Sequence, residues 1–176
     1  MDLHNEESRN RFRWPVFADA IIDADAGKVW AAISESGSLV DCHPFCKSNP
    51  VSQWPGAGAV DEVHYLNGLV YERRFRAWHE GTGFDLEIFH KDKTIAWVSW
   101  RIAALDDDHA ALTIKVYPMG LQGRPLWLRW VPHLFVLRPR LRAYLSSVVG
   151  GYRWFIEKGE AVPRNAFGRH PWFSAP

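Results

Sequence analysis

The feature that most constrains the fold is a series of short segments of alternating polarity in the middle of the chain, separated by turn signals. One of these signals is Asn67-Gly68, which is typical of hairpins, and alternation of apolar and polar residues is typical of strands with one buried face. We therefore expect five consecutive strands joined by short turns in an antiparallel meander. The first expected strand follows a Pro/Gly turn within residues 52–66, and the others are residues 69–80, 84–90, 94–104 and 111–118.

Alternation sorts the side chains of this meander onto two faces, because successive residues of a strand point in opposite directions. The apolar face consists of Leu86, Ile88, Ala96, Val98, Trp100, Ile102, Leu112, Ile114 and Val116. The polar face consists of Asp85, Glu87, Ser99, Arg101, Thr113 and Lys115. We expect the polar face to meet solvent. The apolar face needs a second layer of structure over it.

The expected second layer is a long amphipathic helix near the C-terminus. Pro139 suits the first turn of a helix. Apolar residues then recur at spacings of three and four up to about residue 158, namely Leu141, Leu145, Val148, Tyr152 and Phe155. Gly150 and Gly151 lie inside this helix, where each costs about 1 kcal/mol relative to alanine. Their presence predicts either a kink or a neighbouring group that approaches the helix backbone.

The elements before the meander are shorter. Residues 16–26 predict a strand, and residues 25–35 predict a helix with Asp25 as its N-cap. Residues 39–50 contain two prolines and predict a broken helix or a loop. Together with the meander and the final helix, these segments give an α+β domain with two short helices after its first strand.

The 176-residue chain suits one domain with flanking segments. We expect a flexible arm at residues 1–14, a domain at residues 15–160 with an insertion or lid at residues 119–138, and a C-terminal tail at residues 161–176. The tail carries Phe167, Trp172 and Phe173. Because exposed aromatic side chains on a free tail would be sticky, we expect the tail to dock on its own domain or on a partner subunit.

The order of these segments resembles the START-like (SRPBCC) helix-grip superfamily. That superfamily includes polyketide cyclase/dehydratase proteins, lipid-transport proteins and relatives of the birch-pollen allergen. The resemblance covers residues 15–160 and depends on the order of several weak motifs. They are "ADAIIDADAGKVWAAISE", "HPF", "GAGAVDEVHYLNG", "YERRF" and the helix at residues 138–158.

The resemblance implies a curved antiparallel sheet wrapped around the long C-terminal helix, with an elongated apolar cavity between them. Families of this kind bind lipids, sterols, hormones or polyketides in the cavity, and some catalyse cyclisation or dehydration. Relatives often turn the acid of the "ER" pair inward, which would place Glu72 in the cavity. Alternation instead favours Phe75 as the inward residue, and a β-bulge would reconcile the two.

The first functional hypothesis is that the chain binds a small apolar or amphipathic molecule between the sheet and the C-terminal helix. Glu72 is the candidate polar anchor, since ligand pockets pair an apolar wall with a few polar groups. The expected wall residues are Trp30, Leu86, Val98, Trp100, Leu112, Ile114, Val148, Tyr152 and Phe155.

Two alternatives belong to other functional classes. One is an enzyme of cyclase/dehydratase type acting on a polyketide-like substrate, with His64, His79 or Glu72 as general acid or base. His64 and His79 lie on the two strands of the Asn-Gly hairpin, so we expect them to be able to approach each other. The other alternative is a membrane-associated lipid carrier.

The carrier hypothesis depends on a basic, aromatic segment at residues 124–142. No acid occurs between His109 and Ile156, and this segment mixes arginines with tryptophans and leucines. Its tryptophans would pack into the domain, or residues 124–137 would contact an anionic membrane, or the segment would form a homodimer contact. A nucleic-acid partner is not expected, because the formal net charge is only +1 and no recognition helix is evident.

Other motifs limit the chemistry further. Cys42, His43 and Cys46 fall within "CHPFC", but a fourth ligand at a standard spacing is missing, so we expect neither a metal nor another cofactor. The sequence contains no GxSxG, HExxH or Gly-rich phosphate loop. It also shows no secretory signal or membrane-spanning run, and its two cysteines suit a reducing compartment, so we expect a cytoplasmic protein.

Overall fold

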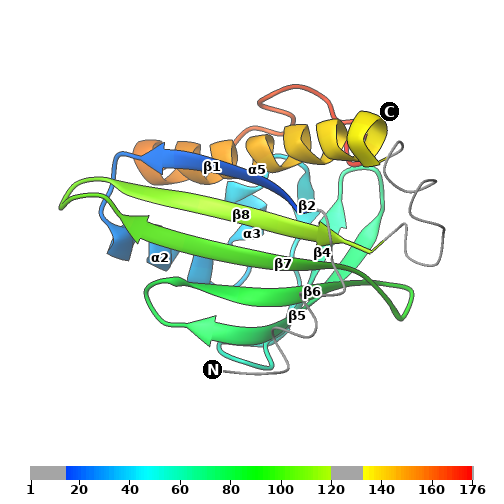
Figure 1. Cartoon of the computed structure of the whole chain (residues 1–176), viewed down its shortest axis with the longest axis horizontal. Coiled ribbons are helices and arrows are strands. Elements are labelled where there is room, and N and C mark those ends of the chain that lie inside the picture. The colour runs from blue at the N-terminus through cyan, green and yellow to red at the C-terminus, as the bar shows by residue number, and fades with distance from the viewer. Residues whose placement is uncertain (1–14, 120–132, 176) are drawn as a thin grey trace.

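The computed structural model describes residues 15–119 and 133–175, and these form a curved antiparallel sheet with a long helix lying across it (Figure 1). The strands are β1 (Val16–Ile22), β2 (Cys46–Ser48), β3 (Val51–Gln53), β4 (Val60–Tyr65), β5 (Val70–His79), β6 (Gly83–His90), β7 (Lys93–Ala104) and β8 (Ala110–Pro118). The helices are α2 (Ala26–Ser34), α3 (Leu39–Cys42) and α5 (Arg138–Lys158), the last preceded by a turn of π-helix at His133–Leu137. The α+β helix-grip architecture predicted from the sequence is confirmed.

The meander from β4 to β8 is also confirmed. Its strands are neighbours in the sheet, whose order is β1-β8-β7-β6-β5-β4-β2, and β3 pairs with β4. The sequence did not predict β2 and β3, which are three residues each and too short to show alternation. The Asn67-Gly68 hairpin forms, but its connection runs over residues 66–69 between β4 and β5, so it is longer than the two-residue turn.

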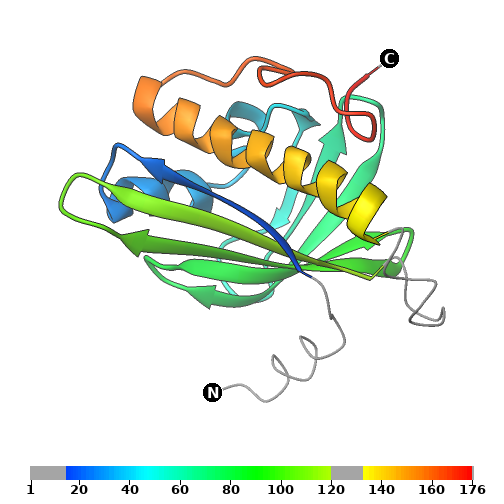
Figure 2. The ribbon, with the colours of Figure 1, turned by 45° about the horizontal axis from the view of Figure 1, so that its top comes forward.

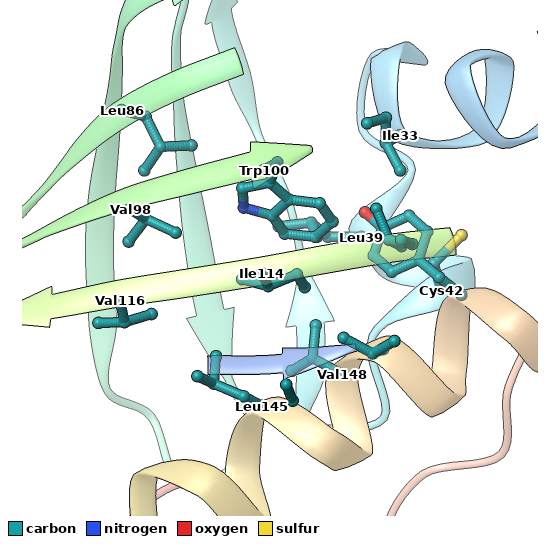
Figure 3. Close-up of a cluster of buried hydrophobic side chains, with 14 of the residues drawn as sticks. Ile33, Leu39, Cys42, Leu86, Val98, Trp100, Ile114, Val116, Leu145 and Val148 are labelled. Carbon is teal, nitrogen blue, oxygen red and sulfur yellow. The ribbon is translucent and has the colours of Figure 1, made fainter. Parts of the chain in front are cut away.

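The apolar face of the meander is buried against the helices, as expected. In Figure 3, Leu86, Val98, Trp100 and Ile114 project from the strands toward α5. The polar face was predicted to meet solvent, but its centre is buried. Asp85 has no exposed surface, and its carboxylate accepts hydrogen bonds from Ser99 Oγ at 2.5 Å and from Arg101 Nη2 at 2.8 and 2.9 Å.

The helices cover the concave side of the sheet, with α5 running above it (Figure 2). Asp25 caps α2 as predicted, because its carboxylate accepts a hydrogen bond from Lys28 N at 2.9 Å. Gly151 lies against the end of α3, where an added Cβ would sit 2.1 Å from the Cys42 carbonyl oxygen. The close approach predicted from the glycine pair is therefore a helix–helix contact rather than a ligand contact.

The C-terminal tail docks on its own domain and runs back along α5 (Figure 2). Asn165 N donates to the Pro44 carbonyl oxygen at 2.9 Å, and His170 Nε2 lies 3.0 Å from the Arg140 carbonyl oxygen. Phe167 meets the helix backbone at Gly150, the other glycine of the pair. The tail thus fixes Trp172 and Phe173 near the N-terminal half of α5.

Candidate ligand-binding cavity

A cavity of about 200 Å³ lies between the sheet, α5 and the C-terminal tail. Its apolar wall comes from β4 to β8, from α3 and from the first half of α5. The described apolar and aromatic residues that line it include Leu39, Val63, Leu86, Ile88, Ile95, Ala96, Val98, Trp100, Ile114, Val116, Leu137, Leu141, Leu145, Val148, Trp172 and Phe173. An apolar cavity of about 150 Å³ is enough to take up benzene, so this one has room for a small organic molecule.

The cavity has a buried floor and a more exposed rim. Leu86, Trp100 and Ile114 on the floor are buried, whereas Ile95 and Leu137 on the rim are half-buried. The rim lies where β7 begins and where the turn before α5 ends.

The space at the far end of the sheet is filled instead of hollow. Five aromatic rings pack there, and we refer to them as the aromatic end: Trp30, Trp54, Phe75, Trp78 and Phe84. Their polar atoms are satisfied within the protein, since the indole nitrogens of Trp30 and Trp78 both donate to the Glu80 carboxylate, at 2.9 and 3.0 Å. The aromatic end therefore closes one side of the cavity with a solid core.

Tyr71 and four further polar side chains line the cavity, and we refer to those four as the polar end: His43, Tyr65, Arg73 and Tyr144. They come from the loop after α3, from β4, from β5 and from α5, so four separate elements converge there. His43 Nε2 lies 2.9 Å from Tyr144 Oη, and Tyr144 Oη lies 2.9 Å from Tyr65 Oη. These three groups form one hydrogen-bonded chain on the cavity wall.

The protonation of His43 follows from its surroundings. Burial, reinforced by the positive charge of Arg73, lowers the pKa of His43 to about 3, so the ring is neutral at pH 7. Its Nδ1 accepts a hydrogen bond from Phe45 N at 3.2 Å. A neutral imidazole that accepts at Nδ1 carries its hydrogen on Nε2. His43 Nε2 therefore donates to the Tyr144 hydroxyl oxygen.

Tyr65 and Tyr144, the two tyrosines of this hydrogen-bonded chain, stay protonated at neutral pH. Burial raises the pKa of Tyr65 well above its usual value, and the neighbouring Tyr144 hydroxyl adds to this effect. Burial likewise raises the pKa of Tyr144. Phe173 of the tail stacks on Tyr65 at a centroid distance of 4.5 Å and packs at a tilt against Tyr144 at 4.4 Å. The tail therefore holds the chain of hydroxyl groups in a dry environment.

Arg73 brings a positive charge to the cavity wall. Its Nε donates to Asp61 Oδ1 at 2.6 Å, and its Nη2 donates to Asp61 Oδ2, in a bidentate pair that is almost fully buried. Burial alone would lower the pKa of Arg73, but the Asp61 carboxylate outweighs burial and raises the pKa, so the side chain stays charged. A bidentate pair of this kind holds the guanidinium group of the arginine in a fixed orientation.

The structure places five of the predicted wall residues on the cavity: Leu86, Val98, Trp100, Ile114 and Val148. The other predicted wall residues are elsewhere. Trp30 belongs to the aromatic end, Leu112 and Tyr152 are fully buried in the core, and Phe155 packs against the core from the far half of α5. The part that any of these residues plays in ligand binding stays a prediction.

Glu72 lies outside the cavity, on the opposite face of β5 from Arg73. It pairs with Arg74 there, and the strand partner of Glu72 is Glu62 of β4. The β-bulge in β5 lies after Phe75, so it turns Trp78 into the core without changing the direction of Glu72. Phe75 is buried, as alternation favoured.

The predicted histidines also lie away from the cavity lining. His64 is on the outer face of β4, 2.6 Å from Glu62, and His79 is 3.5 Å from Asp85 at the far end of β5. The strand register places His64 of β4 opposite Val70 at the start of β5, whereas His79 is at the end of β5, so the two histidines cannot approach each other. The prediction that they could meet is wrong, because it ignored the length of β5.

The two cysteines of "CHPFC" are free and buried. Burial raises the pKa of the Cys46 thiol to about 12 and raises that of Cys42 as well, so neither is a thiolate near pH 7. A nucleophilic cysteine needs the opposite shift. Among residues 15–119 and 133–175, no three His, Cys, Asp or Glu side chains are grouped so that they could hold a metal ion.

Residues 124–132 of the basic, aromatic segment predicted to contact a membrane or a second copy lie outside the described residues. Of residues 124–137, the structure describes 133–137, in which Phe135 and Val136 are exposed. In the part of the chain that the structure describes, no helix has the length and apolar character needed to cross a membrane.

The sequence patterns did not lead to a prediction of the polar end. Tyr65 and Arg73 have the odd-numbered, inward parity of β4 and β5, but an arginine inside an apolar face is rare, and the family resemblance favoured Glu72 as the polar anchor. The inward parity of Phe75 was a signal that Arg73, two residues earlier, also faces inward. Nothing in the sequence indicates that His43 and Tyr144 meet, because 101 residues separate them.

Comparison with known proteins shows similarity in structure alone. No protein-family model matches the sequence, and no curated protein matches it. Among solved structures, DynU16 from the dynemicin biosynthetic locus matches 84% of this chain and 48% of its own length, with 17% identity and a TM-score of 0.61. The di-domain ARO/CYC BexL from the BE-7585A biosynthetic pathway matches 81% of this chain and 47% of its own length, with 11% identity and a TM-score of 0.63.

A third match is the Zhui aromatase/cyclase from Streptomyces sp. R1128, which covers 85% of this chain and 99% of that protein, with 16% identity and a TM-score of 0.56. This chain therefore spans about half the length of DynU16 and BexL but nearly all of Zhui. At these identities the matches show the fold alone. The chain has the START-like helix-grip fold, as its resemblance implied.

Proposed function

We propose that this protein binds a small, mainly apolar molecule in the cavity between its sheet and α5. The observation that carries this proposal is the cavity of about 200 Å³, which persists beside a tightly packed aromatic end. An interior that needed only stability would fill this space, since empty volume costs free energy. The lining of the cavity also supports the proposal, because ligand pockets of other proteins combine such an apolar wall with a few polar groups.

The size of the cavity limits the ligand. Pockets that hold drug-sized molecules occupy about 300–1,000 Å³. At about 200 Å³, this cavity suits a molecule of one or two rings or a short chain. Within this proposal the protein works in the cytoplasm, where the Cys42 and Cys46 thiols stay reduced.

The proposal is tested by a substitution on the sheet that places a larger side chain in the cavity. Ala96 of β7 lines the cavity, so we expect Ala96→Phe to weaken the binding of ethylbenzene by at least about tenfold through loss of space. Ala103→Phe is the matched control, because Ala103 is exposed on the same strand. Isothermal titration calorimetry gives both affinities. Equal binding to both variants and to the wild type would show that the probe binds elsewhere.

A second candidate function is an enzyme of cyclase/dehydratase type. It is favoured by the convergence of titratable side chains at the polar end, and two of the structural matches are an ARO/CYC protein and an aromatase/cyclase. General acids and bases work best with a pKa near the working pH. His43 and the two tyrosines are shifted away from pH 7, so binding is better supported than acid–base catalysis.

The enzyme hypothesis has its own test. The protein would be incubated with a short poly-β-ketone, and ring formation would be followed by absorbance and mass spectrometry. Turnover that disappears in the double variant Tyr65→Phe, Tyr144→Phe would establish catalysis. An unchanged substrate under conditions in which it binds would leave binding as the function.

A third candidate is a membrane-associated lipid carrier that touches a membrane near the start of α5. Phe135 is 72% exposed, and arginines follow at positions 138, 140 and 142 in the first turns of α5. Exposed apolar and basic residues of this kind bind anionic lipid surfaces. Sedimentation with vesicles containing phosphatidylserine at low salt tests this candidate, and Phe135→Ser is expected to reduce the bound fraction. A protein that stays in the supernatant would rule it out.

A further inference from the structure

The polar end of the cavity holds a surplus of hydrogen-bond donors. Arg73 uses Nε and Nη2 for Asp61, and its Nη1 donates to no group among the described residues. Arginine offers five N–H donors and no acceptor. Arg73 therefore presents unused donors at the cavity wall, even though its charge is paired.

The hydroxyl chain adds one more donor. His43 Nε2 donates to Tyr144 Oη, and one hydrogen bond joins Tyr144 Oη to Tyr65 Oη. The two hydroxyl groups carry two hydrogens, and the bond between them uses one. The other hydroxyl hydrogen has no acceptor among the described residues, whichever tyrosine carries it. Because unpaired buried donors are costly, a ligand that accepts at this place would be favoured.

The charges at the polar end decide which kind of acceptor fits. Arg73 is the one cationic side chain among the described residues that line the cavity, and Asp61 already balances it. His43 cannot add a charge at pH 7 because its pKa is about 3. A ligand carboxylate would be a second buried anion sharing one cation, and its desolvation would be poorly compensated. A neutral acceptor avoids this cost.

We propose that the cavity recognises its ligand through a neutral carbonyl oxygen, held by the free donors of Arg73 Nη1 and of the Tyr65–Tyr144 hydroxyl pair. The ligand class is then a small, mainly apolar ketone, aldehyde, ester or amide. This inference rests on the proposed binding function and adds the chemistry of the recognised group. It assigns Arg73, and not Glu72, as the polar anchor of the site.

Three probes of nearly equal shape test the inference: ethylbenzene, acetophenone and benzoate. Calorimetric titration of the wild-type protein is expected to show acetophenone binding about tenfold more tightly than ethylbenzene, because a hydrogen bond to a charged donor adds to the same apolar contact. Benzoate is expected to bind more weakly than acetophenone. A tighter complex with benzoate would overturn the choice of a neutral acceptor.

Variants test whether the preference for acetophenone over ethylbenzene comes from the polar end. Arg73→Lys keeps the charge opposite Asp61 but removes the fork of guanidinium donors, so we expect the preference for acetophenone over ethylbenzene to fall below about threefold. Arg74→Lys is the matched control, because Arg74 follows Arg73 on β5 but faces outward toward Glu72. The double variant Tyr65→Phe, Tyr144→Phe removes the hydroxyl groups while keeping both rings, and it is expected to lower the preference about threefold.

The outcomes separate this inference from the proposed function. If ethylbenzene binds the wild type but acetophenone gains nothing, the carbonyl inference is overturned and the apolar cavity stands. A preference that survives in both polar-end variants would overturn it as well. If none of the three probes binds, the proposed function fails together with the inference. Circular dichroism of each variant confirms that its fold is intact.

Discussion

The two ends of the space between the sheet and α5 differ in how they are filled. At the aromatic end, large rings such as those of Phe75 and Phe84 meet at centroid distances near 5 Å, and indole nitrogens find acceptors within the protein. At the cavity end, the sheet contributes smaller side chains such as Ala96 and Val98, and the polar atoms retain unused donors. The aromatic end is closely packed and its polar atoms are paired, whereas the cavity end keeps empty space and unused hydrogen-bond donors.

The difference follows from residue size along the same strands. On β7, Trp100 stands near the aromatic end, with Ala96 and Val98 nearer the rim. On β6, Phe84 stands near the aromatic end, followed by Leu86 along the inward face. Because inward residues on paired strands face the same layer, a decrease in side-chain volume along both strands leaves a space that α5 alone does not fill.

The largest expected effect comes from removing a ring at the aromatic end. Phe84→Ala leaves a void among tightly packed rings, and we expect the free energy of unfolding to fall by about 3–5 kcal/mol. Phe173→Ala is the matched change beside the cavity. Since Phe173 already borders empty space and belongs to the tail, we expect about half that loss. Urea denaturation measures both, and equal losses would contradict the contrast between the two ends.

A second prediction concerns the contact that positions the loop carrying His43. In Gly151→Ala the new Cβ would lie 2.1 Å from the Cys42 carbonyl oxygen, so α3 and α5 must separate. We expect a loss of about 2–4 kcal/mol in the free energy of unfolding. Gly150→Ala is the adjacent control, where the nearest atom is on the half-exposed Phe167 ring. Its helix propensity gain of about 1 kcal/mol offsets the crowding, so little change is expected.

The pH dependence of stability tests the buried state of His43. Its pKa is about 3 in the folded protein and 6.5 when unperturbed, so the unfolded chain takes up a proton as the pH falls through 6.5 while the folded protein does not. The folded state is therefore destabilised toward acid, by about 2 kcal/mol between pH 7.5 and pH 5. His43→Gln removes this contribution. Urea denaturation of both proteins at the two pH values measures the difference between them, and a difference near zero would mean that His43 is protonated in the fold.

Much of the fold was predictable from the sequence, because it depends on patterns that repeat over many residues. Alternation identified β6, β7 and β8 and the side chains of Leu86, Val98 and Ile114 that line the cavity. Helical spacing identified α5 and Val148. These predictions succeed because each element buries one face, and burial imposes a period on the sequence.

The polar end was not predictable, because it depends on contacts between distant segments and on residues that break the pattern. Arg73 occupies an inward position that a hydrophobic residue would normally take, and Asp61 makes this possible from the neighbouring strand. The tail residue Phe173 completes the wall, although its segment shows no periodic pattern. Trp30 had the right spacing for a wall residue but packs with Trp78 instead.

The most direct measurement is a methyl NMR titration of the wild-type protein with ethylbenzene. We expect the methyl resonances of Leu86, Val98, Ile114 and Val148 to shift in a saturable way, since these side chains line the cavity. The methyl resonances of Val29 and Ile33, which pack in the core from α2 without lining the cavity, are expected to stay in place. Uniform or absent shifts would mean that the space beneath α5 does not take up a ligand.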